Sequence, residues 1–226
     1  MRLSNSTKDS TSPYWELRYP LIGTLLPTDH GYRIYSAISH KISAVHELTN
    51  WSMATIGGKP NGHREIVLNE NSQLRIRTSQ EYVPLFLQLV HKLLKIERYS
   101  LVLQPPDIHP ISPAPTLKAR LVVIKGFQEP EPFIRAVKYQ LQKLGIDDSH
   151  VYVPNNNLGQ PDRKALKVHE HKVVGFSVVV DKLDALDSIA LQIAGCGGKQ
   201  KMGCGFFTSV SIPTNEQNTG TQSSNA

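Results

Sequence analysis

The feature with the clearest chemical potential is a glycine-rich segment near the C-terminus, residues 195–205, which reads GCGGKQKMGCG. Glycine permits positive φ and close approach of the backbone, so successive N–H groups can converge on an anion. Two lysines add positive charge beside these donors. The segment therefore predicts a phosphate-binding loop; the alternative is a helix C-cap followed by a flexible turn. Its candidate binding residues are Gly195, Gly197, Gly198, Lys199, Lys201, Gly203 and Gly205.

Two familiar phosphate-binding loops do not match this segment. A P-loop places Ser or Thr directly after Gly-Lys and then starts a helix, whereas Gln200 follows Lys199 and we expect a strand next. In the dinucleotide-binding fingerprint, Gln200 would occupy the position of the third glycine. The sequence therefore predicts no nucleotide cofactor, and we expect no cofactor of any kind.

Two residue pairs have types that bind metals. His169 and His171 alternate along a predicted strand and would face the same side, but a catalytic zinc needs at least three protein ligands and no nearby residue completes the set. Cys196 and Cys204 are the only cysteines, too few for a disulfide framework or a four-thiolate zinc site. We expect a basic strand face, two free thiols and no metal site.

The elements that would position the loop follow a pattern that occurs twice. The first half predicts a strand, a helix whose apolar stripe includes Ile34 and Ile38, two short strands, a second helix and a strand. The expected ranges are 15–23, 32–46, two strands around a turn at 69–71, 80–94 and 98–103, with 49–64 left unplaced.

The second half repeats this order after a proline-rich linker. It predicts a strand at 117–125, a helix at 131–144, a strand pair at 166–171 and 173–180, a helix around 186–193 and a last strand at 206–212. We therefore expect an α+β fold of two tandem ferredoxin-like (RRM-like, βαββαβ) domains with a C-terminal glycine-rich loop. The expected boundaries are a flexible arm at 1–12, domains at 13–104 and 117–213, a linker at 105–116 and a disordered tail at 214–226.

Composition narrows the partners. The 226 residues include 25 Lys and Arg against 19 Asp and Glu, a net charge of +6, and 39% are hydrophobic. No apolar run approaches the roughly 18 residues of a membrane span, and the N-terminus lacks the apolar stretch of a signal peptide. These features predict a soluble, cytoplasmic, basic protein whose charged partner is nucleic acid.

A glycine- and lysine-rich loop between the last helix and last strand of such a doubled fold resembles the repeat-associated mysterious protein (RAMP) superfamily. Within it, the chain is most similar to the CRISPR repeat-processing endoribonucleases, especially those of the Myxococcus-type subtype. The matching stretches span about residues 14–212 and comprise Leu26–Tyr32, Pro113–Leu121, Ile124–Phe133, Lys172–Phe176 and the loop itself.

The resemblance implies an enzyme of antiviral defence that cleaves precursor CRISPR RNA at the 3′ base of a repeat hairpin without a metal. The 2′-hydroxyl would attack the adjacent phosphate, giving a 2′,3′-cyclic phosphate and a 5′-hydroxyl. This reaction needs a base, an acid and positive charge near the phosphate. Histidine suits the first two roles because its ordinary pKa, about 6.5, lies near working pH.

The resemblance also places the catalytic histidine on or just after the first helix. His46 falls at the border of the apolar and polar faces and is our first candidate. His30 is the second; alternatively it is a turn residue that fixes the helix entry. His40 points away from the apolar stripe and is expected to be solvated. Tyr32 and Tyr35 would orient the substrate or be half-buried packing residues, and Lys41 is expected in solvent.

Basic residues suggest where RNA would bind. In relatives, the second domain's strand pair packs against the repeat hairpin, and Arg163, Lys164 and Lys167 lead into it here. Lys118 and Arg120 share one face of a predicted strand. The aromatic signature of an ordinary RNA-recognition motif is missing, so we expect recognition of hairpin shape plus a few bases at its foot.

Three functions remain open at this point. The first is the endoribonuclease, which would stay bound to the mature guide RNA as a subunit of the effector complex. The second is a non-catalytic structural subunit of that complex, with the same fold and loop holding guide RNA. The third is a general RNA-binding protein unrelated to CRISPR, which would show no preference for a repeat hairpin.

Overall fold

The computed structural model describes residues 13–169 and 171–210. The predicted arm at 1–12 and tail at 214–226 lie outside these residues. One long strand, β1 (Tyr14–Ile22), organises the first half, because it pairs antiparallel with three others. These partners are β6 (Gln73–Ser79), β8 (Tyr99–Leu103) and β9 (Asp107–Pro110). With β3 (Trp51–Met53) and β7 (Leu93–Ile96), the sheet order is β3-β6-β1-β8-β7.

Alternation along β6 explains why this sheet has two different faces. Leu74 and Ile76 are fully buried in the core under α1 (Gly31–Lys41) and α2 (Val83–Leu87). Arg75 and Arg77 point to the opposite face, toward the second half of the chain. A small sheet of β2 (Leu25–Pro27), β5 (Glu65–Val67) and β4 (Lys59–Pro60) extends from this half.

The helices of the first half are shorter than the sequence pattern predicts. The predicted helix at 32–46 is observed as α1, followed by a 3₁₀ turn, η1 (Ser43–His46). The helix predicted at 80–94 is wrong beyond its start, where η2 (Gln80–Tyr82) precedes α2. His91 adopts a positive φ of 61°, and β7 follows as a hairpin with β8. Leu94 and Ile96 are buried at the two-residue spacing of a strand, although Leu94 also continues the helical spacing of the apolar residues before it.

In the second half, β10 (Leu117–Val122) is central and pairs antiparallel with β13 (His171–Asp181) and β14 (Phe207–Ser209). Two further strands, β11 (His150–Tyr152) and β12 (Arg163–Val168), pair with successive parts of β13. Helices α3 (Pro130–Lys143) and α4 (Ala185–Ala194) cover the core face. In the first sheet β1 lies between β6 and β8, and in the second β10 lies between β13 and β14, so the chain is a mixed α+β protein with antiparallel sheets.

The segment at 105–116, predicted as a linker, contains β9, which pairs with β1 and so belongs to the first sheet. The halves are also joined through buried polar contacts. Arg77, 1% exposed, contacts the Glu16 carboxylate at 2.9 Å and donates to the Gln192 carbonyl of α4 at 2.9 Å. Its guanidinium lies 4.0 Å from the ring centroid of Phe206. Among the described residues, no helix is long and apolar enough to cross a bilayer.

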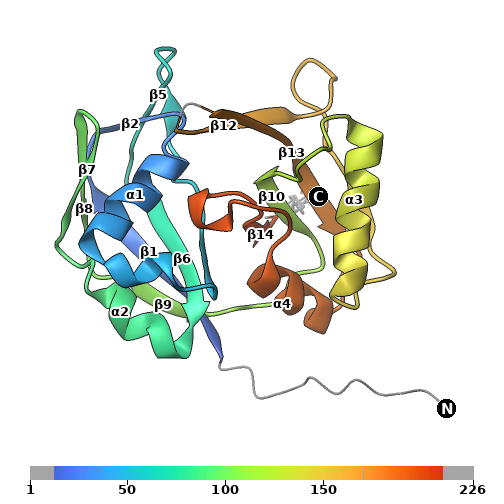
Figure 1. Cartoon of the computed structure of the whole chain (residues 1–226), viewed down its shortest axis with the longest axis horizontal. Coiled ribbons are helices and arrows are strands. Elements are labelled where there is room, and N and C mark those ends of the chain that lie inside the picture. Colours follow the sequence, from blue (N-terminus) through green and yellow to red (C-terminus); the bar gives the residue numbers. More distant parts are fainter. Residues whose placement is uncertain (1–12, 170, 211–226) are drawn as a thin grey trace, which may run out of the picture.

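The glycine-rich segment follows α4 and lies between α1 and β10, where Figure 1 shows it in orange and red. Its 3₁₀ turn, η3 (Gln200–Met202), packs against α1 and β3 of the first half. The loop therefore contacts both halves: Met202 of its turn lies against Gly31 at the start of α1, and Lys201 reaches the carbonyls of η1.

Candidate functional site

His46 lies at the last position of η1, directly after α1, and its side chain is exposed. Its Nδ1 is 3.0 Å from the hydroxyl of Tyr35, in the middle of α1. The Tyr35 ring stacks on the buried Trp51 ring with centroids 6.1 Å apart. Tyr35 is thus fixed by packing and in turn orients the imidazole. With Nδ1 engaged, Nε2 is the nitrogen that this exposed ring can offer to a substrate.

Lys201 of η3 reaches the same place from the other end of the chain. Its Nζ donates to the carbonyl oxygen of His46 at 3.2 Å and to that of Val45 at 3.4 Å. The amine lies 5.9 Å from the centroid of Trp51. Partial burial lowers the pKa of Lys201. The loop therefore brings a positive charge to the C-terminal carbonyls of η1, which favour a cation.

His30, the second catalytic candidate, lies in a different environment. Its side chain is 2% exposed, its Nδ1 is 2.8 Å from the Pro27 carbonyl, and its Nε2 accepts the N–H of Ile56 at 2.9 Å. Both ring nitrogens are thus engaged inside the protein. Burial lowers the pKa of His30 to about 4, so the ring is neutral at pH 7. This geometry matches the alternative role that the sequence left open, a residue that fixes the entry to α1.

The glycine-rich loop uses its own donors internally. All five glycine N–H groups donate within the protein: Gly195 to Leu191, Gly197 to the Gln140 side chain, Gly198 to Val123, Gly203 to Gln200 and Gly205 to Leu121. The expected convergence of these N–H groups on a phosphate is therefore not available in this conformation. Positive charge in the loop comes from Lys199 and Lys201.

The glycines of the loop instead permit close packing, both within the loop and between the halves. A Cβ on Gly203 would lie 2.5 Å from Cγ2 of Thr55, and one on Gly205 would lie 2.1 Å from the Cys196 carbonyl oxygen. On the facing helix, a Cβ on Gly31 would lie 2.1 Å from the carbonyl oxygen of Met202. These contacts explain glycine at these positions without a bound anion.

Lys118 and Arg120 lie on the exposed face of β10, as alternation predicts. They line a hollow of about 330 Å³ between the two sheets, which Arg75 lines from the first half. Arg75 also contacts the buried Glu16 carboxylate at 2.8 Å, which offsets its positive charge. Lys118 and Arg120 therefore provide the positive charge of this hollow that Glu16 does not offset. The structure thus joins one predicted basic strand face with an arginine that sequence reasoning did not single out.

The basic residues of β12 lie on two different faces of the strand. The Lys164 amine contacts the Asp162 carboxylate at 2.5 Å, which offsets its charge. Arg163 and Lys167 are exposed on the other face, and the Lys167 N–H donates to the Asp29 carboxylate at 2.6 Å. Lys167 lines a hollow of about 650 Å³ that also contains Arg33 and other basic side chains, Arg64 and Lys172.

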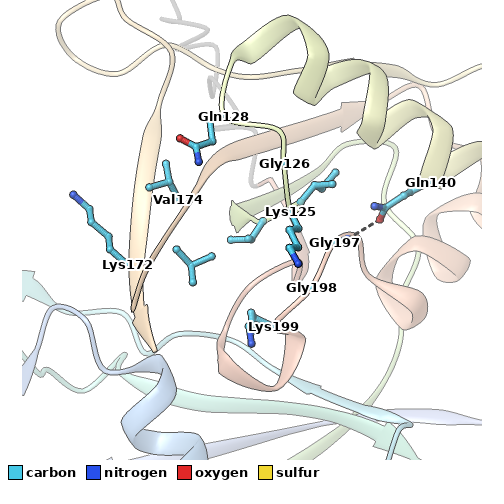
Figure 2. A pocket seen from close by; sticks show the side chains of 12 residues that line it. Lys125, Gly126, Gln128, Gln140, Lys172, Val174, Gly197, Gly198 and Lys199 are labelled. Carbon is cyan, nitrogen blue, oxygen red and sulfur yellow. Dashed lines mark hydrogen bonds between the residues drawn. The ribbon is translucent and has the colours of Figure 1, made fainter. Parts of the chain in front are cut away.

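A further basic hollow of about 540 Å³ lies beside the glycine-rich loop, and Figure 2 shows it from close by. Lys125, Lys172 and Lys199 surround it, while Gln140 accepts the Gly197 N–H at one side. Sequence reasoning named only Lys199 of these lysines. The available signal was that Lys125 and Lys172 fall within two of the stretches that resemble CRISPR repeat-processing enzymes.

The remaining metal-binding residue types are separated or buried. His169, at the turn between β12 and β13, has its Nε2 2.9 Å from the Tyr32 hydroxyl. Within 13–169 and 171–210, no three His, Cys, Asp or Glu side chains gather as a metal site would require. Cys196 and Cys204 are free and buried, and burial raises the pKa of each thiol to about 12.

Comparison with known proteins identifies the family. The family model described as Cas6 Crispr matches residues 15–211. A curated relative, the CRISPR-associated endonuclease Cas6 of Myxococcus xanthus (strain DK1622), is 32% identical over 192 residues, which are 85% of this chain and 80% of the relative. The chain therefore belongs to the Cas6 family, and its resemblance to CRISPR repeat-processing RAMP proteins is confirmed.

Solved structures share the fold at low sequence identity. A structure described as a RAMP protein binding different RNA substrates has a TM-score of 0.64 and 15% identity, and covers 88% of this chain and 100% of its own. A Cas6-related protein from Pyrococcus furiosus has a TM-score of 0.59 and 12% identity, with coverage of 88% and 98%. These likenesses extend the family assignment to the three-dimensional fold.

Proposed function

We propose that this protein is a metal-independent endoribonuclease that binds the CRISPR repeat hairpin and cleaves precursor CRISPR RNA at its 3′ base. The observation that carries the proposal is the exposed His46, held by Tyr35 and lying beside the Lys201 amine. The curated relative's description as an endonuclease supports the activity, and the RAMP neighbour's description as RNA-binding supports the substrate class. The shared strand order of the two halves supports two ferredoxin-like domains.

The chemistry follows from the atoms available. Nε2 of His46 takes the proton of the 2′-hydroxyl while the 2′-oxygen forms a bond to the adjacent phosphorus. The bond from phosphorus to the 5′-oxygen breaks, and solvent supplies the proton for that leaving oxygen. The products are a 2′,3′-cyclic phosphate and a 5′-hydroxyl, with no net oxidation or reduction. The Lys201 ammonium stabilises charge that grows on the phosphoryl oxygens.

RNA binding draws on charge from both halves. Lys118 and Arg120 in the hollow between the sheets and Lys199 in the loop contact phosphates, together with Arg163 and Lys167 of β12. Phosphate contacts provide affinity and fall with rising salt, while base contacts at the foot of the hairpin provide sequence preference. Because cleavage at an edge of this surface leaves the hairpin contacts intact, the protein stays on the product as a subunit of an effector complex.

The test uses end-labelled repeat RNA from the same locus in excess EDTA, with the wild type, His46→Ala and His40→Ala side by side. His40 is the matched control, because it is also exposed and lies on α1. We expect wild-type cleavage in EDTA, at least about 100-fold slower cleavage by His46→Ala with binding retained, and near-normal cleavage by His40→Ala. A 2′-deoxy nucleotide at the cleavage position should abolish cleavage.

Other results would change the assignment. Hairpin binding without cleavage by the wild type would make the protein a non-catalytic subunit that holds guide RNA. Equal binding of hairpin and unrelated RNA would favour a general RNA-binding protein. Cleavage of the 2′-deoxy substrate would exclude internal attack by the 2′-hydroxyl.

A further inference from the structure

Two aromatic rings remain on the surface of the second half. Phe127 is 37% exposed and Tyr139 is 59% exposed, and they are the exposed aromatic side chains among residues 13–169 and 171–210. Both line the same open hollow of about 520 Å³ beside α3. Neither belongs to the apolar clusters that form the described core. These rings therefore have no packing role in the core that would explain them.

The surroundings of these rings are basic. Arg135 and Lys143 line the same hollow, and the Lys143 amine lies 4.4 Å from the centroid of Tyr139. Among residues 13–169 and 171–210, no acidic side chain lines this hollow; Glu129 and Glu131, just before and within the first turn of α3, are the nearest acids in sequence. A surface with flat exposed rings among cations fits a polyanion that carries its own flat groups.

The hollow continues toward the glycine-rich loop. It shares Ile124 and Gln140 with the neighbouring hollow in Figure 2, which contains Lys125, Lys172 and Lys199 and no acidic side chain from the described part of the chain. Lys199 precedes by two positions the Lys201 that contacts the His46 carbonyl. Basic side chains therefore line both hollows between the glycine-rich loop and α3. Helix α3 lies on the outer side of the second half (Figure 1).

We propose that this surface, here called the α3 surface (Lys125, Phe127, Arg135, Tyr139 and Lys143), binds unpaired RNA that flanks the repeat hairpin, with bases stacked on Phe127 and Tyr139. Paired bases in a duplex are already stacked on each other, so exposed rings bind single strands, whose bases have free faces. The lysines and arginine contact the phosphates of the same strand. The identity of the strand as a hairpin flank rests on the proposed function.

The experiment uses the full chain and RNAs with a 2′-deoxy cleavage position, so that binding is measured without cleavage. Three probes are compared: the hairpin alone, the hairpin with a 5′ flank and the hairpin with a 3′ flank, each flank of about 10 nucleotides. The double variant Phe127→Ala/Tyr139→Ala removes both rings. Tyr139→Phe keeps the ring, and Leu186→Ala removes a side chain that is 74% exposed on α4, away from the α3 surface.

We expect the double variant to lose about 10-fold affinity per ring for one flanked RNA and none for the hairpin alone. The flank that shows the loss identifies which side of the hairpin binds here. Tyr139→Phe and Leu186→Ala should bind all three probes like the wild type. Unchanged binding of both flanked RNAs by the double variant would overturn the proposal and favour a protein partner for this surface. An equal loss on the hairpin alone would also overturn it.

A fourth probe, a single strand of the flank sequence alone, separates this proposal from the proposed function. If the wild type neither binds the hairpin nor cleaves its all-ribose form, but binds the single strand through the two rings, the α3 surface is supported and the hairpin ribonuclease is not. If the hairpin is cleaved normally and the double variant binds the single strand as well as the wild type does, the hairpin ribonuclease is supported and the α3 surface is not.

Discussion

Two histidines near the first helix differ in everything that decides their chemistry. His46 is exposed, and its Nδ1 contacts the Tyr35 hydroxyl. His30 is buried, and both of its ring nitrogens form hydrogen bonds within the protein. The sequence placed both histidines beside the first helix but did not indicate which of the two is buried. Helical periodicity put His46 at the edge of the apolar face of one helix, whereas the structure ends α1 at Lys41 and places His46 in η1. The partners of His30 come from a carbonyl and an N–H that lie 3 and 26 positions away, and periodicity does not register such contacts.

The buried His30 predicts a pH-dependent stability. The pKa of His30 is about 4 in the folded chain and about 6.5 when unfolded, so the unfolded state binds a proton first as pH falls. This group's contribution is therefore complete above pH 6.5 and is lost progressively below it. We expect it to lower the free energy of unfolding by about 2 kcal/mol between pH 7 and pH 5.

Chemical denaturation of the wild type and His30→Gln over this pH range measures the effect. The variant should be less stable at pH 7 but flatter with pH, whereas the exposed His63→Gln should keep the wild-type slope. Parallel slopes for the wild type and His30→Gln would show that His30 is protonated normally in the folded chain.

At the scale of elements, the contact between α1 and η3 sets the distance between the two sides of the candidate active site. Gly31, the first residue of α1, has no room for a side chain because the Met202 carbonyl oxygen would lie 2.1 Å from its Cβ. Gly31→Ala should push η3 away from α1 and move the Lys201 amine from the His46 carbonyl. We expect cleavage at least about 10-fold slower, because small displacements in an active site are costly.

Single-turnover cleavage with saturating RNA measures this change. Gly57→Ala is the matched control, because no atom lies within 4 Å of its added Cβ and its φ is not positive. That variant should cleave like the wild type. If Gly31→Ala cleaved equally fast, the position of η3 against α1 would not matter for the reaction.

The elements themselves were predictable where one periodicity dominates. The stripe of α1 and the alternation in β6 predicted their buried faces, and the last strand was placed after the glycine-rich loop. The helix predicted at 80–94 extended too far because Leu94 continues the helical spacing of the apolar residues before it, whereas in the structure Leu94 and Ile96 alternate as buried residues of a strand. The positive φ at His91, a non-glycine residue, was not signalled by its residue type. β9 was hidden in a proline-rich segment because its pairing with β1 is a tertiary contact.

At the scale of the whole molecule, Arg77 ties the two halves together. Its buried guanidinium contacts Glu16 in its own sheet, the Gln192 carbonyl of α4 and the face of Phe206. Arg77→Met should lower the free energy of unfolding by about 3 kcal/mol, because it leaves buried polar groups without their partner. Arg18→Met removes a contact to the same carboxylate from a side chain that is 39% exposed, and should cost less than about 1 kcal/mol.

Urea unfolding of both variants gives the comparison, and hydrogen exchange of α4 shows whether the junction between the halves loosens. If both variants lost a similarly small free energy of unfolding, the burial of Arg77 would not make its contacts more stabilising than those of Arg18.

The candidate site as a whole was only half visible in the sequence. The loop and the first helix were each singled out, but no pattern indicated that Lys201 would meet the His46 carbonyl. Nor did composition reveal that the loop glycines serve close packing, since glycine enrichment is common to anion cradles and tight contacts. Contacts between distant segments depend on how the two sheets pack, and the local periodicity of a sequence does not indicate that packing.

The contact between Lys201 and the carbonyl of His46 joins residues 155 positions apart. During synthesis, the ribosome releases the histidine long before it has made the lysine. A nascent chain therefore holds the first half of the site while α4, the loop and β14 are still missing. Since Lys201 of the loop also contacts the turn that bears His46, the candidate site is complete only after the loop has been made, and messages that stop before the loop yield chains with an incomplete site.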